Sequence, residues 1–512
     1  MVVKSVIAHG ATGLVVEIEC HLSNNLPNIV IVGFANKAVD EARERLRGAF
    51  ASCQLALPRK RIIVNLAPAD IPKADSGFDL AIAVSILQAS QQLTLIAADK
   101  TAFIGELGLD GSTRAVRGII GKLLAGRDQG ITSFYIPRAN LQQSLLVPGI
   151  TIVAIANLRE LADHLTGVNI IAASQASTTE AAKNTMSHNV EFDRSRVAIS
   201  MVVGQLQAKR AIEIAAAGGH NILLSGPPGT GKSMLAKAMP SIMPPLDREE
   251  ILEVTHLHSL ASHDYDRIIF ERPIRAPHHS ASHAAIVGGG ATSRPGEITL
   301  AHRGILFFDE LPEFGRSTLE ALRQPLEDRR ITVSRVRDSI DYPANFVLIA
   351  TANPCPCGYY GYTAAGICRC LPQHIMHYQQ KLSGPIIDRI DLYTSVHEVE
   401  HATLLATAAD AKADEAIRQR VVRARRMQAK RYGSHQLNAD VSNLQLRQLG
   451  QLEAPAKLLL DTAAAKLQLS ARAYMRTVKV ARTIADLAAS PAISPAHLSE
   501  ALAYRPQLTA PV

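Results

Sequence analysis

The stretch "SGPPGTGKS", Ser225–Ser233, decides the fold expected for this chain. It contains the pattern G-x-x-x-x-G-K-[ST], follows the apolar run "NILL" and opens the helical run "SMLAKAMP". A strand, this loop and a helix together form a phosphate-binding loop, whose glycines let successive N–H groups point at phosphate oxygens. The helix N-terminus adds a partial positive charge. The residues predicted to bind a nucleotide are Gly226, Pro227, Pro228, Gly229, Thr230, Gly231, Lys232 and Ser233.

A second apolar run, "GILFFDE", supplies the acidic half of the predicted site. It ends in Asp309 and Glu310, at the carboxyl edge where parallel sheets place ligands. We expect Lys232 to reach the β- and γ-phosphates, Ser233 and Asp309 to hold Mg²⁺, and Glu310 to polarise the attacking water. A solvated acidic turn is the alternative, but it fits less well with the loop upstream. The predicted cofactors are therefore ATP and Mg²⁺.

Asn353 and Arg389 are two further candidates for a role in ATP hydrolysis. The strand-like run "NFVLIATAN" ends in Asn353, whose amide would position the water or contact the γ-phosphate. The segment "SGPIIDRIDLY" places Arg389 between two aspartates. Arg389 either forms a local salt bridge or projects into a neighbouring subunit as a finger that neutralises transition-state charge.

Composition limits the classes of protein to consider. The chain has 512 residues, 47% of them hydrophobic, which indicates a globular protein of about three domains. No run approaches the roughly 18 apolar residues that span a bilayer, and the N-terminus does not resemble a signal peptide. We therefore expect a cytoplasmic protein with no membrane partner and with reduced cysteines. The net charge of +8 fits a polyanionic partner or simply a basic protein, and the 4% aromatic content disfavours base stacking.

Four regions differ in their patterns, and together they predict an α/β fold. Residues 1–167 mix strand-like and helical runs, which is typical of an α+β or α/β domain. Residues 168–190 are predicted to be a linker. In residues 191–395 apolar strands alternate with helices, which predicts a parallel sheet with crossovers. Residues 396–512 are rich in Ala, Leu and Arg and predict a helical lid or bundle.

The motifs "GPPGTGKS", "ILFFDE", "TANP" and "GPIIDRIDL", in this order, resemble AAA+ ATPases of the magnesium-chelatase-like group. The segment "RPIRAPHHSASHAAIVGGG" narrows the resemblance to the YifB/ComM subfamily of competence and DNA-processing ATPases, and the resemblance runs nearly end to end. It implies a ring, expected to be a hexamer, with ATP between subunits and branch-migration helicase activity in recombination or natural transformation. It favours the finger over the local salt bridge for Arg389. It also implies that Arg472 of the lid reads the γ-phosphate, a role that Arg476, one helical turn away, can share. Both arginines could instead be surface charges.

The N-terminal region resembles the proteolytic domain of Lon-type proteases, which has a ribosomal S5 domain 2-like fold and a Ser–Lys dyad. The likeness lies in "VNLAPADIPKADSGFDLAIA" and "IGELGLDGSTRAVRGIIGKLLAG". An ungapped comparison places Gly77 at the nucleophile position and Ile120 at the lysine position. We therefore predict a Lon-like domain without peptidase activity. A displaced dyad of Ser76 and Lys122 stays open.

A stretch between the acidic strand and the sensor strand is the main candidate for DNA contact. In "RRITVSRVRDSIDYPANF" the residues alternate as in a β-hairpin. The family resemblance implies that a hairpin at this place faces the ring's pore, so that Arg335 and Arg337 would project toward a phosphate backbone. An exposed strand protected by its charges is the alternative. The basic helix predicted for 418–433 carries charges around much of its circumference, which favours a solvated or subunit-facing helix. The histidines His278, His279 and His283 are expected to be structural or interfacial.

Four of the six cysteines lie in residues 355–370 as two C-x-C pairs. In a reducing compartment such a cluster indicates metal ligands or free thiols rather than disulfides. Zinc is favoured over an iron–sulphur cluster and over free thiols, although the spacing is tighter than the usual C-x₂-C. We expect a structural clip rather than a catalytic metal. The four predicted ligands are Cys355, Cys357, Cys368 and Cys370, whereas Cys20 and Cys53 are distant and expected to be packed.

Three other functions compete with a DNA motor. A magnesium-chelatase motor subunit is disfavoured by the fused N-terminal domain and the cysteine insertion. An ATP-dependent Lon-like protease is disfavoured by the displaced dyad. A regulator that only switches conformation would not need Glu310 and Arg389.

Overall fold

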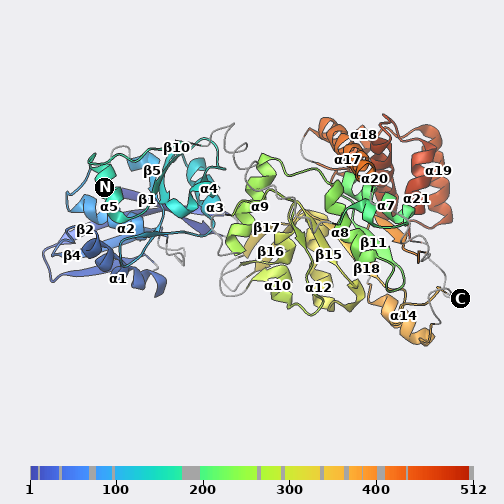
Figure 1. Ribbon diagram of the computed structural model, residues 1–512, viewed down its shortest axis with the longest axis horizontal. Helices are drawn as coiled ribbons and strands as arrows, with labels where there is room; N and C mark the ends of the chain where they lie inside the picture. The colour runs from blue at the N-terminus through green and yellow to red at the C-terminus, as the bar shows by residue number, and fades with distance from the viewer. Residues whose placement is uncertain are drawn as a thin grey trace. The chain divides into compact units, whose positions relative to one another are not determined.

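The computed structural model describes most of the chain, and contacts between residues divide it into two units (Figure 1). The first unit contains Met1–Glu191, Asp247–Phe270 and Val336–Tyr342, and the second contains Phe192–Leu246, Glu271–Arg335 and Pro343–Val512. The residues described are 2–9, 12–33, 37–68, 77–94, 98–175, 197–261, 267–289, 294–334, 339–362, 368–382, 384–399, 410–433 and 436–506.

The first unit is built on an eight-stranded mixed sheet in the order β10-β9-β8-β5-β1-β2-β4-β3. Its strands form where apolar residues alternate: in β4, Ile62, Val64 and Leu66 are buried while the residues between them are less so. The strands are β1 (Val2–His9), β2 (Thr12–Ser23), β3 (Asn28–Val32), β4 (Arg61–Ala67), β5 (Thr101–Phe103), β8 (Ser133–Pro137), β9 (Thr151–Ile155) and β10 (Ser174–Gln175), with a separate pair, β6 (Glu106–Leu107) and β7 (Thr113–Arg114).

Helices cover this sheet. The most buried is α2, which packs against β1 and β2, as expected for a helix that is apolar on nearly every side. The helix α3 also packs against β1 and β2. The helices are α1 (Lys37–Ser52), α2 (Asp79–Ala89), α3 (Ile119–Asp128), α4 (Leu141–Ser144) and α5 (Leu158–Leu165).

The helix α9 (Arg248–Ala261) also groups with the first unit, although its sequence lies between two elements of the second. Its buried His256 packs against α3, where a Cβ atom on Gly121 would lie 2.5 Å from Cε1 of the imidazole ring. Only glycine leaves room for this ring. The sequence pattern carries no signal for this grouping.

The second unit contains a five-stranded sheet in the order β12-β15-β18-β11-β19, and every neighbouring pair is parallel. This confirms the parallel sheet predicted from the sequence. Strand β18 is buried along its whole length, as expected for a strand covered on both faces. The strands are β11 (Ile222–Ser225), β12 (Ile274–Arg275), β15 (Ile305–Phe308), β18 (Val347–Ala352) and β19 (Leu392–Ser395).

Helices and a short strand pair complete the region around this sheet. The strands β13 (Gly288–Gly289) and β14 (Arg294–Pro295) pair with each other. The strands β16 (Arg330–Ser334) and β17 (Ser339–Pro343) form a separate two-stranded sheet, and most of β17 groups with the first unit. The helices are α7 (Leu206–Gly218), α8 (Lys232–Ile242), α10 (His283–Val287), α11 (Glu297–Leu300), α12 (Arg316–Ala321), α13 (Arg323–Asp328), α14 (Pro372–Gln380) and α15 (Gly384–Ile387).

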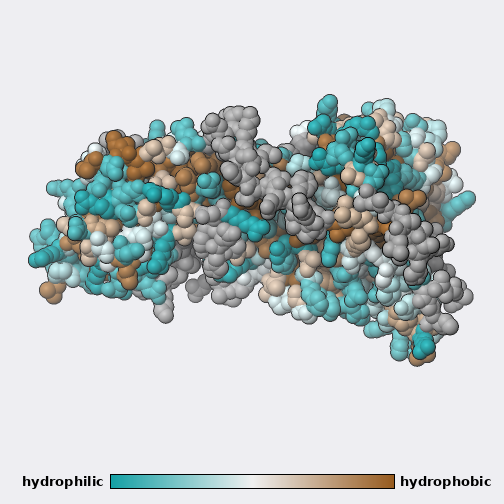
Figure 2. All heavy atoms as spheres, viewed as in Figure 1, coloured by the Kyte–Doolittle hydropathy of each residue, from teal (hydrophilic) through white to brown (hydrophobic). Residues whose placement is uncertain are grey.

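The C-terminal part of the second unit is helical, as predicted. Val480 and Ile484 of α20 share one apolar core with Ile222 and Ile349 of the sheet. The helices α17 and α20 pack against α7, which in turn packs against β11 and β19. Figure 2 shows mainly hydrophilic side chains over α17, in keeping with the solvated or subunit-facing helix expected there. Among the described residues, no helix is both long and apolar enough to cross a membrane. The helices are α17 (Ala411–Tyr432), α18 (Asn443–Leu449), α19 (Ala454–Lys466), α20 (Ala471–Leu487) and α21 (Pro495–Ala503).

A candidate nucleotide site

Three neighbouring parallel strands bring the predicted site residues to one edge of the sheet. Strand β11 runs into the phosphate loop at Gly226, β15 runs into Asp309, and β18 runs into Asn353. Because β15, β18 and β11 are adjacent and parallel, their carboxyl ends meet at the same edge. The sheet thus brings together three segments that are far apart in the sequence.

The backbone of the phosphate loop needs its glycines. Gly229 and Gly231 have φ angles of 82° and 85°, in the left-handed region that glycine adopts without strain. A Cβ atom on Gly226 would lie 2.3 Å from the carbonyl oxygen of Val396, so no side chain fits there. Thr230 donates its hydroxyl to the carbonyl of Pro227 at 2.9 Å and closes the turn. The helix α8 then starts at Lys232.

The ammonium of Lys232 lies inside this loop. Its Nζ donates to the carbonyl oxygens of Gly226 and Pro227, both at 2.8 Å, and lies 3.2 Å from Oδ1 of Asn353. Burial lowers the pKa of Lys232, and the nearby Asp309 and Glu310 partly offset this effect. The carbonyls that hold the ammonium are weaker partners than phosphate oxygens, so a phosphate bound here would be a better counter-charge.

The two predicted magnesium ligands contact each other directly. Ser233 donates its hydroxyl to Oδ2 of Asp309 at 2.9 Å, while Oδ1 of Asp309 accepts from the hydroxyl of Thr351 at 2.6 Å. A hydroxyl and a carboxylate are the oxygen ligands that Mg²⁺ prefers. The residues present therefore fit a magnesium ion that also binds phosphate.

Thr351 is a site residue that the sequence prediction missed. Its buried hydroxyl accepts from the backbone N–H of Glu310 at 2.8 Å and donates to Asp309, so it fixes both acidic residues. The available signal is a hydroxyl residue in the otherwise apolar strand "VLIATA". Glu310 itself is exposed and has a φ of 53°, a strained conformation for a residue with a side chain.

Arg389 and Arg472 meet at a single carboxylate. The buried Arg389 places Nη2 2.7 Å from Oε1 of Glu327 in α13, and Nη2 of Arg472 lies 3.3 Å from the same oxygen. Arg476 donates from Nη1 to Oδ1 of Asp391 at 2.5 Å and to the carbonyl of Arg389 at 2.9 Å. Arg389 thus does form a salt bridge within the chain, with Glu327 of a distant segment.

These arginines lie at the opposite edge of the sheet from the phosphate loop. The side chain of Asn221, which precedes β11, donates to the carbonyl of Arg389 at 3.1 Å, whereas the loop follows the other end of β11. At about 3.3 Å per residue, Asn221 and Gly226 are roughly 16 Å apart. That separation is longer than an arginine side chain, so Arg389 does not face the phosphate loop of its own chain.

Comparisons with known proteins match nearly the whole chain. Family models described as "Subunit ChlI of Mg-chelatase", "Magnesium chelatase, subunit ChlI" and "Magnesium chelatase, subunit ChlI C-terminal" cover residues 18–140, 198–404 and 411–505. The uncharacterized protein YifB of Escherichia coli (strain K12) is 40% identical over 505 residues, 98% of this chain and 96% of the relative. The competence protein ComM of Haemophilus influenzae is also 40% identical, over 98% of this chain and 97% of the relative.

The chain belongs to the YifB/ComM group of magnesium-chelatase-like AAA+ ATPases. A more distant relative, the magnesium-chelatase 67 kDa subunit of Heliobacterium mobile, is 26% identical and matches 39% of this chain and 36% of its own length. The family assignment confirms the resemblance inferred from the motifs. It leaves the role of each site residue as a prediction.

Several predicted residues of this YifB/ComM-type chain lie outside the described parts. Arg335 and Arg337, the candidates for DNA contact, fall in the undescribed segment 335–338 that connects β16 and β17. Ser76 also lies outside the described residues, whereas Lys122 and Ile120 are fully buried on α3. The dyad of Ser76 and Lys122 and the likeness to Lon-type proteases therefore stay predictions.

The histidine cluster does not form a metal site among the described residues, in which the only group of three or more close ligands is made of cysteines. The rings of His278 and His279 lie 4.1 Å apart, and His279 lies 6.4 Å from Phe314. These ring contacts are in keeping with the structural or interfacial role expected.

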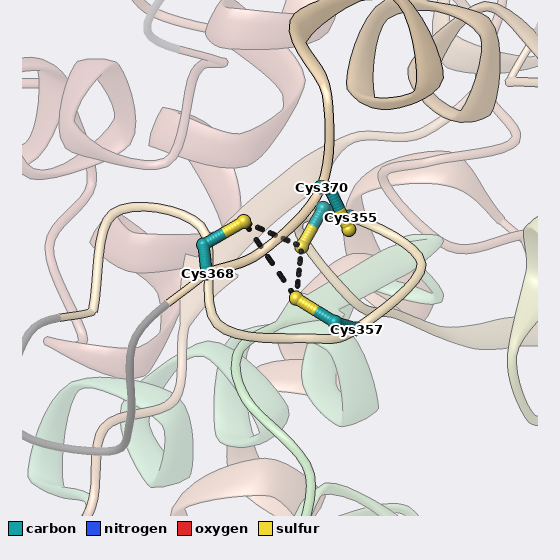
Figure 3. Close-up of side chains that lie close together, drawn as sticks. All are labelled: Cys355, Cys357, Cys368 and Cys370. Atoms are coloured by element: carbon teal, nitrogen blue, oxygen red, sulfur yellow. Dashed lines mark hydrogen bonds between the residues drawn. The ribbon is translucent and has the colours of Figure 1, made fainter.

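The four clustered cysteines converge (Figure 3). Their Sγ atoms all lie within 4.8 Å of one another, although a stretch outside the described residues separates the second from the third cysteine along the chain. Cys355 is fully buried and directly follows the sensor segment that contains Asn353. The ligand set predicted from the sequence is thus brought together next to the candidate nucleotide site.

Proposed function

We propose that the chain hydrolyses Mg²⁺–ATP at the interface between identical subunits of a ring, expected to be a hexamer, and uses the energy to remodel branched DNA. The observation that carries the proposal is the separation of the charged groups. Lys232, Ser233 and Asp309 lie at one edge of the sheet, and Arg389 and Arg472 lie at the other. One subunit would bind ATP at its first edge and offer its arginines to the next subunit's ATP.

Each residue then has a defined task. Lys232 neutralises the β- and γ-phosphates, and Ser233 and Asp309 hold the magnesium ion that bridges them. Glu310 takes a proton from the attacking water, and the amide of Asn353 orients that water or the γ-phosphate. Arg389 supplies positive charge to the transition state of the neighbouring subunit. Head-to-tail use of two different surfaces closes into a ring when the rotation between subunits allows it.

The DNA part of the proposal rests on other observations. One relative is named a competence protein, and this chain carries a net charge of +8. Arg335 and Arg337 fall between two paired strands, the position at which the family resemblance places a hairpin facing the ring's pore. With aromatic residues at only 4%, contacts to the phosphate backbone are expected to dominate over base stacking.

The test compares ATP hydrolysis by the purified protein alone, with single-stranded DNA and with a four-way junction, and then measures strand separation. We expect stimulation by DNA and separation of junction arms. A Glu310→Gln variant should bind ATP and yet hydrolyse it about a hundredfold more slowly, since the general base is removed. Hydrolysis that responds to neither DNA would reject the DNA part and leave the ATPase part standing.

A salt titration tests the proposed DNA contacts. Replacing Arg335 and Arg337 by Ala should weaken DNA binding and reduce the salt slope, because two phosphate contacts are lost. The charge-matched control replaces two arginines of α17 by Ala, the half-buried Arg418 and the exposed Arg426. An equal effect of both double variants would show that net charge alone is responsible.

A magnesium-chelatase motor subunit is the second candidate. The observation that favours it is the printed description of all three matching family models. This function predicts ATP hydrolysis that is stimulated by partner chelatase subunits with a porphyrin and is indifferent to DNA.

A further inference from the structure

The four cysteines that follow strand β18 have sulfur–sulfur distances of a metal site. Cys355 lies 3.3 Å from Cys357 and 3.8 Å from Cys368, and Cys357 lies 3.6 Å from Cys368, sulfur to sulfur. A tetrahedral ion with zinc–sulfur bonds of about 2.3 Å separates its ligand sulfurs by about 3.8 Å. These three distances are close to this value.

Other arrangements of the four thiols fit less well. A disulfide needs two sulfurs at about 2.05 Å, and all four cysteines are free. A disulfide joins only two sulfurs, whereas here four sulfurs lie within 4.8 Å of one another. No histidine or carboxylate belongs to this group of close ligands among the described residues, so the donor set is purely thiolate. Such a set suits zinc or an iron–sulphur cluster.

We propose that Cys355, Cys357, Cys368 and Cys370 bind one zinc ion. This ion holds the loop that carries them, called here the cysteine loop, against the phosphate loop of the nucleotide site. Four protein ligands leave no open position, so the zinc is structural rather than catalytic. The second half of the proposal rests on the proposed function, because it assigns the phosphate loop to nucleotide binding.

Contacts between the two loops carry this second half. Gly358 lies one residue after Cys357 and is buried, with a φ of 88°. A Cβ atom there would lie 2.4 Å from Cδ of Pro228, so the cysteine loop is packed directly against the phosphate loop. On the other side, Asn353 contacts Lys232 at 3.2 Å, two residues before Cys355.

The C-terminal end of the cysteine loop is also anchored, by a contact from α14. After Cys370 the chain enters α14, whose Gln379 donates to the carbonyl of Pro354 at 3.1 Å. The two C-x-C pairs therefore lie between the sensor strand and a helix that returns to it. A metal ion at this point ties both ends together and presents Gly358 to Pro228. Loss of the ion would free the loop and leave the phosphate loop less well organised for nucleotide.

The first experiment measures metal content of the full-length protein by mass spectrometry. We expect about one zinc ion per wild-type chain and at least about a tenfold loss in Cys357→Ser and Cys368→Ser. Cys20→Ser, in the other unit, is the matched control and should keep its zinc. Wild-type protein without zinc, or with iron in its place, overturns the zinc assignment. Equal zinc in wild type and both cluster variants also overturns it.

The second experiment measures ADP affinity of the same proteins, with the melting temperature as a check on folding. Cys357→Ser should bind ADP about three- to tenfold more weakly, because the phosphate loop loses preorganisation. Unchanged ADP affinity in a zinc-free variant overturns the coupling to the nucleotide site. Wild-type protein that binds zinc but neither ADP nor ATP refutes the proposed function and leaves the metal site standing.

Two glycine variants distinguish the effect of packing between the loops from the effect of losing the metal. Gly358→Ala keeps all four thiolates and should keep its zinc, yet its methyl group would push on Pro228 and weaken ADP binding. Gly361→Ala, in the same loop, has a similar φ of 80° but nothing within 4 Å of the added Cβ, so it should bind ADP like wild type. Equal ADP affinity of the two variants would remove the contact between Gly358 and Pro228 as the route of coupling.

Discussion

Arg389 and Glu327 form an ion pair of 2.7 Å within one chain, and the same glutamate oxygen lies 3.3 Å from Arg472. The three residues come from the segment before β19, from α13 and from α20. Two arginines therefore share one acidic partner at the edge of the sheet that lies away from the phosphate loop. Under the proposed function, the phosphates of a neighbouring subunit's ATP would be a further anionic partner for these arginines.

This arrangement predicts that two inactive variants restore activity when mixed. Lys232→Ala cannot hold ATP but keeps Arg389, whereas Arg389→Ala holds ATP but lacks the finger. Mixed in equal amounts and allowed to assemble, they should form functional interfaces in about a quarter of cases, and ATP hydrolysis should return accordingly. Steady-state hydrolysis of the mixture, compared with each variant alone, makes the measurement.

A double variant provides the control for mixing. The chain with both Lys232→Ala and Arg389→Ala should not rescue Arg389→Ala, because it offers no arginine. If the mixture of single variants also stays inactive while mixed rings form, Arg389 acts on the ATP of its own chain and the proposed division between subunits is wrong.

Thr351→Val is predicted to weaken magnesium binding at the site without harming the fold. The substitution removes the hydroxyl that donates to Asp309 and accepts from the N–H of Glu310. Because partners of metal ligands typically contribute about tenfold to metal affinity, the Mg²⁺ concentration for half-maximal hydrolysis should rise about tenfold. A Mg²⁺ titration of ATP hydrolysis measures it.

Thr394→Val is the matched control. Thr394 is buried on β19 of the same sheet, with β11 between it and β18, and its hydroxyl has no hydrogen-bond partner within the described structure. Its loss should leave the Mg²⁺ dependence unchanged. If both variants behaved alike, the hydroxyl of Thr351 would have no special part in holding Asp309.

The sequence was sufficient for the sheet and for its phosphate loop because both depend on local patterns. Apolar runs of four to six residues that end in glycine or acidic residues predict buried parallel strands with ligands at their carboxyl ends. The conformation of the loop "GPPGTGKS" depends on its own residues, since Gly229 and Gly231 supply the left-handed backbone conformations that it needs. The set of four cysteines was predictable for the same reason, because its two C-x-C pairs lie close together in the sequence, one at each end of a single loop.

Contacts between distant segments were not predictable. Nothing near Glu327 in the sequence indicates that it holds Arg389 and Arg472, since the three residues meet only after α13, β19 and α20 pack together. The grouping of α9 with the first unit depends in the same way on the fit of His256 over Gly121. Such pairings follow from the shapes of packed surfaces, and a single sequence does not encode them as a local pattern.

Gly226→Ala is predicted to damage both the fold and nucleotide binding. The added methyl carbon would lie 2.3 Å from the backbone oxygen of Val396, which cannot move without breaking the hydrogen bond from Val396 N–H to the carbonyl of Ser225. Overpacking of this kind costs about 1–3 kcal/mol. Urea unfolding and ADP titration should both show the loss. Gly315→Ala, where nothing lies within 4 Å of the new Cβ, should change neither, and equal behaviour of the two would refute the steric argument.

Asp391→Asn is predicted to be among the most destabilising single changes in the second unit. Asp391 is buried, accepts from Arg476 at 2.5 Å and accepts from the N–H of Asn221 at 3.0 Å. Burial raises the pKa of Asp391, but Arg476 and His220 lower it by more, so that the pKa lies well below its usual range. A carboxyl whose pKa is lower in the folded state stabilises the fold above its unfolded pKa, and that stabilisation is lost as the pH falls.

The variant removes the negative charge and leaves Arg476 without its counter-charge, which should cost about 3–5 kcal/mol at neutral pH. Urea unfolding of wild type and variant at pH 7 and near pH 3 measures the effect. Because Asn cannot titrate, Asp391→Asn should lose less stability on acidification than wild type does. The control Glu415→Gln removes an exposed partner of Arg418 and should change little at either pH. An Asp391→Asn protein as stable as wild type at pH 7 would mean that the pair with Arg476 contributes nothing to holding β19 and α20 together.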